Sequence, residues 1–373
     1  MARKDLTMKK IFLLSFFLVI FYLLTAFASS ASSPFLSSAR AAVLYQPDTG
    51  CFLYEKNAAS PLKMASTTKI MTALVAIEMA PLDRMLTVPC EAAGIEGTSL
   101  YLSEGDTGML SDFLYALMLA SANDAAATIA INLSGSIEAF ASKMNERAEE
   151  LQLQNTHFDN PHGLDSENHY TSARDLALLA AEALQNPSFA DIVSTERKTI
   201  YLNNGETVRH LTNHNRLLRS LAGVCGVKTG FTRASGRCLV TAAERSGVRV
   251  IAVTLDCPND WQEHTALLEM GLSSFQYTAL ARKRSIAFRL PVLNGCGDTV
   301  LLSNPRDIYA VFPNDADIET RFDTVQYLTA PIKKGDVLGK VSFYINDTLI
   351  AESPLTAESS ISATQRQKRF FFF

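Results

Sequence analysis

A serine and a lysine stand three residues apart at the start of an apolar-periodic segment. The segment 66–79 has apolar residues at helical spacing, so Ser66 and Lys69 share one face of the predicted helix. A partly desolvated lysine amine can take the proton of a neighbouring serine during attack on a carbonyl, and the positive end of the helix stabilises the oxyanion. Because Ser-x-x-Lys arises about once by chance in a chain of this length, the pair alone is a weak signal, and a helix-capping serine with a solvated lysine is the favoured interpretation of it.

Two further short motifs follow along the chain. Ser121-Ala122-Asn123 comes directly after an apolar helix predicted over residues 113–120, and Lys228-Thr229-Gly230 closes a predicted strand. Taken singly, the first can be a helix-end turn and the second an exposed strand end. Three such motifs in this order, with Asp where this chain has Ala122, are the signature of class A β-lactamases and penicillin-binding proteins. The substitution is mild, since the flanking serine and asparagine are the polar groups that would face a cleft.

On these residues the chain resembles the D-alanyl-D-alanine carboxypeptidases related to the low-molecular-mass penicillin-binding proteins, in particular sporulation-related members from Gram-positive bacteria. The resemblance covers nearly the whole mature chain. It also rests on Asn145 and on residues 156–165, 168–171, 173–176, 213–215 and 331–336. It implies a serine peptidase that removes the terminal D-alanine from peptidoglycan stem peptides ending in D-Ala-D-Ala, and that binds β-lactam antibiotics covalently. The histidines of these segments are expected to be hydrogen-bonded loop residues rather than catalytic ones.

The resemblance implies a role for each residue of the first two motifs. Ser66 would form the acyl-enzyme, with Lys69 as its base. Ser121 would relay the proton to the departing D-alanine. Asn123 would hold the substrate amide.

The third motif and the two residues after it are implied to bind substrate. Lys228 would keep the cleft positive and hold the serine of the second motif. Thr229 and Thr232, with Gly230 and Phe231 between them, would contact the terminal carboxylate. The oxyanion hole would consist of the backbone N–H groups of the nucleophilic serine and of Phe231.

One departure from the family concerns the terminal carboxylate of the substrate. Many members carry an arginine shortly after the strand that follows the Lys-Thr-Gly motif, where it reaches that carboxylate. Residues 256–264 of this chain contain no arginine. Arg249, His264 or the threonines alone could take its place, and the sequence leaves the choice open.

Three other functions are compatible with parts of the sequence. A class A β-lactamase needs a glutamate in a loop ahead of the Lys-Thr-Gly motif to activate a deacylating water, whereas residues 160–165 stand in that place without a Glu-x-x-Leu-Asn pattern. A catalytically idle wall-binding protein is disfavoured, because the serine, both lysines and the asparagine are intact. Cutting of peptide crosslinks, as an endopeptidase, differs only in substrate length and stays open.

The periodicity of apolar residues predicts an α+β fold. A β-hairpin is predicted over residues 41–54, and a capping box of Ser172 and Asp175 opens one of the helices. The other helices and strands are predicted at residues 66–79, 111–120, 136–151 and 172–184, and at 224–228, 237–243 and 248–256 respectively. Helices would thus pack on an antiparallel sheet, and the resemblance implies a penicillin-binding-protein or β-lactamase-like transpeptidase domain.

The division into domains follows from a change of pattern along the chain. The catalytic domain is predicted over residues 35–283. Clear helical periodicity then disappears, and a small all-β domain is predicted over residues 284–356, with strands at 307–312 and 340–351.

The N-terminus has the pattern of a secretory signal peptide. Lys9 and Lys10 precede an apolar run over residues 11–27, and small residues follow, so a leader over residues 1–31 is predicted, with cleavage after Ala28 or Ala31. The alternative is an uncleaved membrane anchor, because the apolar run lies at the lower limit for a membrane span. Either reading places the remainder outside the cytoplasm, at the outer face of the membrane or in the cell wall.

Charge and cysteine spacing argue against several partners. The chain has a formal charge of −4. Residues 1–28 have a net charge of +3, so the remainder has a net charge of −7. Nucleic acid is therefore not expected as a partner. The six cysteines and six histidines lack metal-binding spacing, so no metal or other cofactor is predicted. The cysteines are interpreted as small buried residues, with a Cys225–Cys238 disulfide as the alternative.

The last residues, 357–373, are predicted to be a polar tail rather than a folded element. The tail ends in Arg366, Lys368 and Arg369, followed by four phenylalanines. Basic residues are attracted to anionic lipid and aromatic rings can enter the interface, so one interpretation is peripheral membrane contact. The other is a disordered end without a role.

Overall fold

The structure is a computed structural model, and it describes residues 35–364. The predicted signal peptide and the basic and aromatic end of the tail lie outside the described residues. Within the described part, no helix has the length and apolar character needed to cross a membrane.

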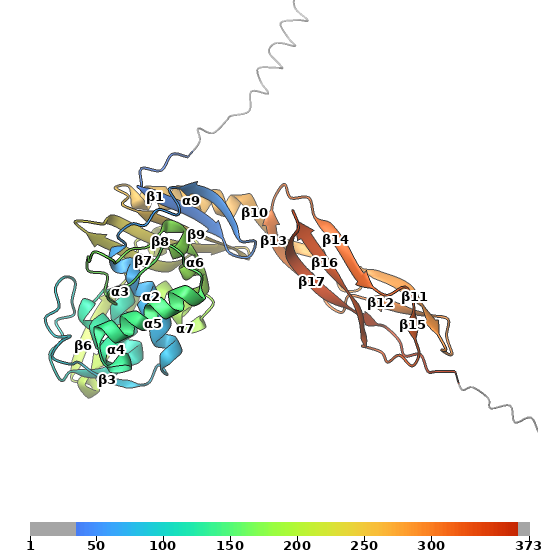
Figure 1. Ribbon diagram of the computed structural model, residues 1–373, viewed down its shortest axis with the longest axis horizontal. Coiled ribbons are helices and arrows are strands. Elements are labelled where there is room, and N and C mark those ends of the chain that lie inside the picture. Colours follow the sequence, from blue (N-terminus) through green and yellow to red (C-terminus); the bar gives the residue numbers. More distant parts are fainter. Residues whose placement is uncertain (1–34, 365–373) are drawn as a thin grey trace, which may run out of the picture. The chain divides into compact units, whose positions relative to one another are not determined.

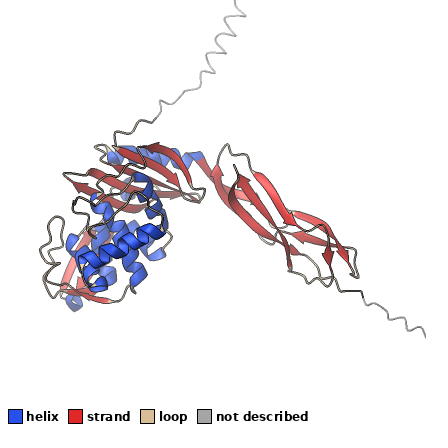
Figure 2. Ribbon diagram, viewed as in Figure 1, coloured by secondary structure: helices blue, strands red, loops and turns tan. Residues whose placement is uncertain are grey.

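A five-stranded antiparallel sheet organises the first part of the chain (Figure 1). In spatial order its strands are β2 (Cys51–Lys56), β1 (Ala41–Gln46), β9 (Val248–Leu255), β8 (Gly236–Arg245) and β7 (Val224–Thr232). The predicted hairpin is therefore present as β1 and β2, and β7 is an edge strand. Most residues of β8 and β9 are buried, because helices cover both faces of the sheet. Figure 2 shows one helix along one face and the other helices against the opposite face.

Helices make up most of the rest of this part of the chain. They are η1 (Ala65–Thr68), α2 (Lys69–Met79), α3 (Leu110–Leu119), α4 (Asn123–Ser134), α5 (Ile137–Glu150), α6 (Ala173–Ala183), α7 (Pro187–Ser194), α8 (Leu217–Ser220) and α9 (Asp260–Ser274). Two short strand pairs accompany them: β3 (Met85–Thr87) with β4 (Thr107–Met109), and β5 (Arg197–Leu202) with β6 (Thr207–Thr212). The apolar core packs helix α2 against α3, α4, α6 and the inner face of the sheet.

Side-chain caps fix two of the predicted helix starts. The hydroxyl of Ser136 accepts a hydrogen bond from the backbone N–H of Ala139 at 3.0 Å, and that of Ser172 accepts from the N–H of Asp175 at 3.1 Å. The carboxylate of Asp175 accepts from the N–H of Asn155 and from a threonine hydroxyl instead of returning to Ser172. Among the described contacts, only one half of the predicted capping box is therefore formed.

The C-terminal part of the chain is built from strands (Figure 1). They are β10 (Phe275–Ala281), β11 (Ala287–Leu293), β12 (Thr299–Ser303), β13 (Ile308–Pro313), β14 (Glu319–Thr324), β15 (Leu328–Thr329), β16 (Val337–Ile345) and β17 (Thr348–Ala357). Six of them form one sheet in the order β14-β16-β17-β12-β11-β15, and β10 pairs with β13. Asn346 and Asp347 form the β16–β17 turn with positive φ angles of 47° and 64°, which is the backbone of a type I′ hairpin.

The predicted α+β class is confirmed, and the differences lie in individual elements. The prediction of an unfolded tail is wrong for residues 357–364, because Ile361 is buried in the C-terminal core and exchanges two backbone hydrogen bonds with Ile332. The predicted helix from Ser66 begins with the 3₁₀ turn η1 before α2. Helices α4, α7 and α9 were not among the predicted ones. The Lys-Thr-Gly motif lies inside β7, not at its end, because the strand continues to Thr232 and pairs there with Gly236.

The six cysteines all lie within residues 35–364, and none of them forms a disulfide there. Cys238 pairs with Gly230 across β7 and β8, whereas Cys225 lies near the opposite end of β7. The alternative of a disulfide between these two residues is therefore wrong. Cys238 and Cys257 are buried as interpreted, but Cys90 and Cys296 are exposed.

Candidate active site

Ser66 lies in the turn η1, directly before helix α2. Among residues 64–70 it is the only one that is not buried. The hydroxyl of Thr67 donates to the carbonyl of Met64 at 2.7 Å, and the hydroxyl of Thr68 donates to the carbonyl of Ala65 at 2.8 Å. These bonds fix the turn, so that the serine hydroxyl faces a cavity while its neighbours are held in the core.

Two glycines bring other segments against this turn. Gly163 has a φ of +89°, and a Cβ there would lie 2.1 Å from the carbonyl oxygen of Ala65. A Cβ at Gly230 would lie 3.1 Å from the backbone nitrogen of Ser66. A Cβ would clash with the backbone at position 163 and would crowd it at position 230. The loop and the edge strand thus approach the backbone around Ser66 from two directions.

The side chain of Lys69 is completely buried beside the nucleophile. Its Nζ lies 3.0 Å from Oγ of Ser66 and 2.7 Å from Oδ1 of Asn123, and it also donates to the backbone carbonyl of His162. Three partners from three segments hold the amine in one position. The serine and lysine predicted to share a helix face are thus in direct contact.

The surroundings of Lys69 favour its neutral form. Burial lowers its pKa well below the usual value for a lysine, and the nearby Lys228 lowers the pKa further, while Asp124 opposes both effects. A neutral amine can accept the serine proton, which an ammonium cannot. The site therefore supplies the base that attack by Ser66 requires.

Ser121 and Asn123 stand at the junction of helices α3 and α4. Ser121 has a φ of +61°, is 5% exposed, and lines the same cavity as the nucleophile. The side-chain amide of Asn123 accepts from Lys69 and donates through Nδ2 to the carbonyl of Glu96 at 2.6 Å. The structure thus places Asn123 as a support for the lysine, a contact that the implied role did not include.

Lys228 occupies the buried side of strand β7. Burial lowers its pKa to about 7. Its Nζ donates to the carbonyl of Thr229 at 2.9 Å. Within the described part of the chain, the Lys228 amine makes this hydrogen bond and none to Ser121. Its effect on the site is a positive potential beside Lys69.

The outer edge of β7 is open for an extended ligand. Phe231 is 66% exposed, and Thr229, Gly230 and Thr232 are half-buried. The N–H and hydroxyl of Thr232 both bond to Oγ of Ser235, at 3.0 and 2.9 Å, which fixes the end of the strand. An edge strand beside a nucleophile can pair with a peptide backbone.

Two adjoining cavities, of 480 and 650 Å³, meet at Ser66. Both are also lined by Thr98 and Phe231. The first continues along Ser121, Thr229, Gly230, Arg216, Arg219, Arg237 and Trp261. The second continues along Glu96, Asn123, His162, Leu164, Asp165, Thr232 and Arg233. A ligand attacked by the serine can therefore extend in two directions.

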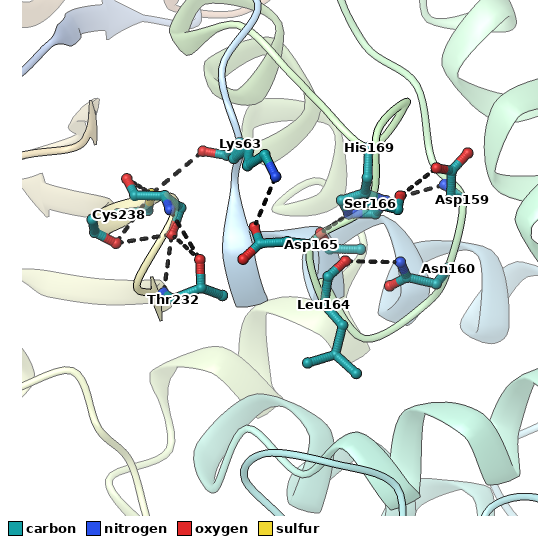
Figure 3. Close-up of polar contacts among 12 residues, drawn as sticks. Lys63, Asp159, Asn160, Leu164, Asp165, Ser166, His169, Thr232 and Cys238 are labelled. Atoms are coloured by element: carbon teal, nitrogen blue, oxygen red, sulfur yellow. Dashed lines mark hydrogen bonds and ion pairs between the residues drawn. The ribbon is translucent and has the colours of Figure 1, made fainter.

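The loop over residues 156–165 forms one wall of the second cavity. Figure 3 shows Asn160 bonded to the carbonyl of Leu164, and Lys63 facing Asp165. Nδ2 of Asn160 donates to this carbonyl at 3.0 Å, and Nζ of Lys63 lies 4.0 Å from Oδ1 of Asp165. Oδ1 of the same asparagine accepts from the N–H of Gly163 at 2.7 Å. These bonds hold the loop in the conformation that lets its glycine touch the nucleophile turn.

Two histidines of this loop region, His162 and His169, are neutral because they are buried. Burial lowers the pKa of His162 to about 3 and that of His169 to about 4. His169 bridges the hydroxyl of Thr68 at 2.7 Å and the N–H of Asp159 at 3.0 Å. This geometry agrees with the expectation of hydrogen-bonded loop residues.

Neither single residue considered for the substrate carboxylate reaches the cavities. Arg249 forms an ion pair with Glu244 at 2.7 Å. His264 is fully buried between the hydroxyls of Thr241 and Thr254, at 2.6 and 2.9 Å, and burial lowers its pKa to about 3. Both lie outside the lining of the two cavities. They are excluded as direct partners of a ligand at Ser66.

The sequence reasoning missed the residues that line the far end of the first cavity. They are Arg216, Arg219, Arg237 and Trp261. Arg216 directly follows the segment Asn213-His214-Asn215, which carried part of the family resemblance, so its position could have been noticed. Nothing in the spacing of the others indicates a site.

The fold and the site define a class of enzyme. A serine hydroxyl in contact with a buried lysine of lowered pKa, next to an edge strand, is the arrangement of acyl-transferring serine hydrolases that use lysine as the base.

Comparisons with known proteins identify the family. Residues 28–259 match the family model of D-alanyl-D-alanine carboxypeptidase, and residues 275–363 match the C-terminal domain of penicillin-binding protein 5. The chain belongs to the D-alanyl-D-alanine carboxypeptidase family, which confirms the resemblance.

Individual relatives cover nearly the full chain. D-alanyl-D-alanine carboxypeptidase DacF of Bacillus subtilis is 33% identical over 364 residues, 92% of this chain and 93% of the relative. DacC of Escherichia coli is 31% identical over 361 residues, 90% of this chain and 88% of the relative. The crystal structure of penicillin binding protein 5 from Haemophilus influenzae has a TM-score of 0.67 at 27% identity, and covers 89% of this chain and 100% of that one.

Proposed function

We propose that this protein is a serine-type D-Ala-D-Ala carboxypeptidase that removes the terminal D-alanine from peptidoglycan pentapeptide stems. The observation that carries the proposal is the 3.0 Å contact between Oγ of Ser66 and the buried Nζ of Lys69. The names of the relatives and the match to a penicillin-binding protein supply the substrate class. β-Lactam antibiotics are expected to inhibit the enzyme by acylating the same serine.

The reaction begins with acylation. Oγ of Ser66 attacks the carbonyl carbon of the penultimate D-alanine while neutral Lys69 takes the hydroxyl proton. The backbone N–H groups of Ser66 and Phe231 receive the oxyanion. Ser121 relays the proton that Lys69 has taken to the departing amine, so that Lys69 is neutral again, the terminal D-alanine leaves as a neutral amine and the stem remains as a serine ester.

Deacylation then uses water in the same geometry. Lys69 removes a proton from the water that attacks the ester carbonyl, and Ser66 recovers its proton as the leaving alcohol. Lys228 contributes positive potential. The substrate lies along the strand edge formed by Thr229, Gly230, Phe231 and Thr232. Oδ1 of Asn123 accepts from Lys69 and one N–H of its Nδ2 donates to the carbonyl of Glu96, so the second N–H of Nδ2 is the donor left for the carbonyl of the substrate amide.

An endopeptidase that cuts crosslinked stems is the second candidate. The two cavities extend on both sides of Ser66, and a crosslinked substrate differs from a pentapeptide only beyond the terminal residue. A β-lactamase-like hydrolase of the same fold would differ in releasing its acyl-enzyme rapidly.

Purified protein without its leader should be tested on a pentapeptide stem and on a crosslinked dimer. Release of D-alanine from the pentapeptide, with slow or no cleavage of the dimer, is the expected result. Faster cleavage of the dimer would assign the enzyme as an endopeptidase, and rapid turnover of penicillin would assign it as a β-lactamase.

We also propose that the enzyme acts outside the cytoplasm, where its substrate lies, and that residues 366–373 contact the membrane surface. Three basic residues add about 1 kcal/mol each near an anionic surface, and four phenylalanines follow them. Sedimentation with anionic vesicles should fall when residues 366–373 are deleted. An unchanged pelleted fraction would end the membrane proposal.

For the domain organisation, we propose a boundary near Phe275 rather than at residue 284. Strand β10 begins there and pairs with β13, and the match to the second family model begins at residue 275. The strand-rich part would then include β10.

A further inference from the structure

The first cavity contains more positive charge than the catalytic residues explain. Three arginines, Arg216, Arg219 and Arg237, and one acidic residue, Asp260, line the same cavity as Ser66 and Thr229. A peptide ending in D-Ala-D-Ala carries a carboxylate one residue beyond the bond that the serine attacks. An arginine in this cavity is therefore in a suitable region to bind that group.

Arg237 is already neutralised by a buried partner. Its Nε and one terminal nitrogen donate to the carboxylate of Asp260 at 3.0 and 2.9 Å, and the Asp260 side chain is 5% exposed. The same carboxylate accepts from the N–H of Trp261 at 2.8 Å. Arg237 thus fixes the start of helix α9 and the position of the indole, and its charge is compensated.

Arg216 has no such compensation. Among the described side chains none forms an ion pair with it, and its guanidinium carbon lies 5.8 Å from the ring centroid of Trp261. Stacking on an aromatic ring limits the orientations of a guanidinium without cancelling its charge. An exposed arginine held in this way loses little entropy when it binds an anion.

The backbone around Arg216 is anchored to the substrate-binding strand. Oδ1 of Asn213 accepts from the N–H of Asn215 at 2.9 Å, and Nδ2 of Asn215 donates to the carbonyl of Gly226 at 2.8 Å. Gly226 belongs to β7, which also carries Thr229. The two asparagines therefore tie the arginine to the strand on which the substrate is expected to lie.

Arg219 is the nearest competitor, because it lines the same cavity. It lies in the short helix α8, and in the described part of the structure it makes neither an aromatic contact nor an ion pair through its side chain. Its guanidinium would have to be immobilised on binding, at a greater entropic cost than that of Arg216.

We propose that Arg216 is the substrate-binding residue that recognises the terminal carboxylate of D-Ala-D-Ala, together with Thr229, in place of the arginine absent from residues 256–264. The proposal rests on the carboxypeptidase function proposed above. It predicts that selectivity for a free carboxylate depends on Arg216, whereas the chemical step at Ser66 does not.

The test compares two substrates, Nα,Nε-diacetyl-L-lysyl-D-alanyl-D-alanine and its C-terminal carboxamide. The parent enzyme should prefer the free acid. Arg216→Ala should lower kcat/KM for the acid by about 30-fold, the range for a charge-assisted hydrogen bond. It should change kcat/KM for the amide by less than about threefold, which is smaller than the fall expected when one neutral hydrogen bond is removed. Arg216→Lys should recover part of the loss, since it restores the charge but not the paired donors.

Arg219→Ala is the matched control, from the same cavity and with the same loss of charge. It should leave the acid-to-amide ratio near the parent value. Equal losses on both substrates in Arg216→Ala, or a larger change of the ratio in Arg219→Ala, would overturn the assignment. A parent enzyme that cleaves neither substrate would instead refute the proposed function, so the two failures are distinguishable.

Discussion

Nζ of Lys69 donates a 2.7 Å hydrogen bond to Oδ1 of Asn123 across 54 positions of the chain. The amide is locked in this orientation because its Nδ2 donates to the carbonyl of Glu96 at 2.6 Å. An uncharged oxygen can hold the amine in place without stabilising the ammonium as strongly as a carboxylate would. This contact is therefore compatible with the lowered pKa of Lys69, and it makes that pKa sensitive to the residue at position 123.

Asn123→Asp should move the acid limb of the acylation profile to higher pH. Acylation needs neutral Lys69, so its rate rises as the pH passes the pKa of this group. A carboxylate at hydrogen-bond distance favours the ammonium and raises the pKa. Second-order rate constants for benzylpenicillin acylation between pH 5 and 10 would show the shift.

Asn204→Asp is the control, since Asn204 is exposed and at a positive φ angle that aspartate tolerates. Its profile should follow that of the parent. An acid limb that stays in place in Asn123→Asp would mean that Lys69 is not the titrating base.

Gly163→Ala should displace the nucleophile turn. The added Cβ would lie 2.1 Å from the carbonyl oxygen of Ala65, so the turn must move, and a misplacement of about 1 Å can lower the rate by about 100-fold. The control is Gly135→Ala, where φ is +85° and no atom lies within 4 Å of the new Cβ. It should cost about 1 kcal/mol of stability from backbone strain and leave acylation unchanged. Equal acylation rates in both variants would contradict the close approach of Gly163 to the turn.

Lys228→Met should slow peptide hydrolysis and also shift its acid limb to higher pH. The charge of Lys228 lowers the pKa of Lys69, so its removal raises that pKa and reduces the neutral fraction. A change of one pH unit corresponds to roughly a tenfold loss on the acid limb. Lys143→Met, at an exposed lysine paired with Glu146, should behave like the parent. Hydrolysis at the parent rate by soluble Lys228→Met would refute the role of the Lys-Thr-Gly motif.

Local pattern was sufficient to predict the segments that carry the motifs. The spacing of Ser66 and Lys69 on one helix brought them into contact, and Ser172 caps its helix as expected. Helix α4 was missed because its first residues, from Asn123 to Ala130, are nearly all buried, so no polar face gives it a helical period. The strand that contains Lys228 was predicted to end by Gly230, because glycine has low β-propensity, whereas Phe231 and Thr232 favour strands and continue β7 to its end.

Contacts between distant segments could not be predicted from spacing. The bond from Asn123 to Lys69 and the approach of Gly163 to Ala65 depend on how helices and loops pack. The position of Arg216, directly after Asn213-His214-Asn215, could be noticed in the sequence, but its contact with Trp261 exists only in the folded chain.

The most direct test of the account is the site of covalent labelling by penicillin. After incubation with benzylpenicillin and proteolysis, mass spectrometry should find one penicilloyl group on the peptide that contains Ser66. Ser66→Ala should remain unlabelled while keeping the thermal transition of the parent. Labelling that persists in folded Ser66→Ala, or an adduct on Ser121, would contradict the assignment of Ser66 as the nucleophile.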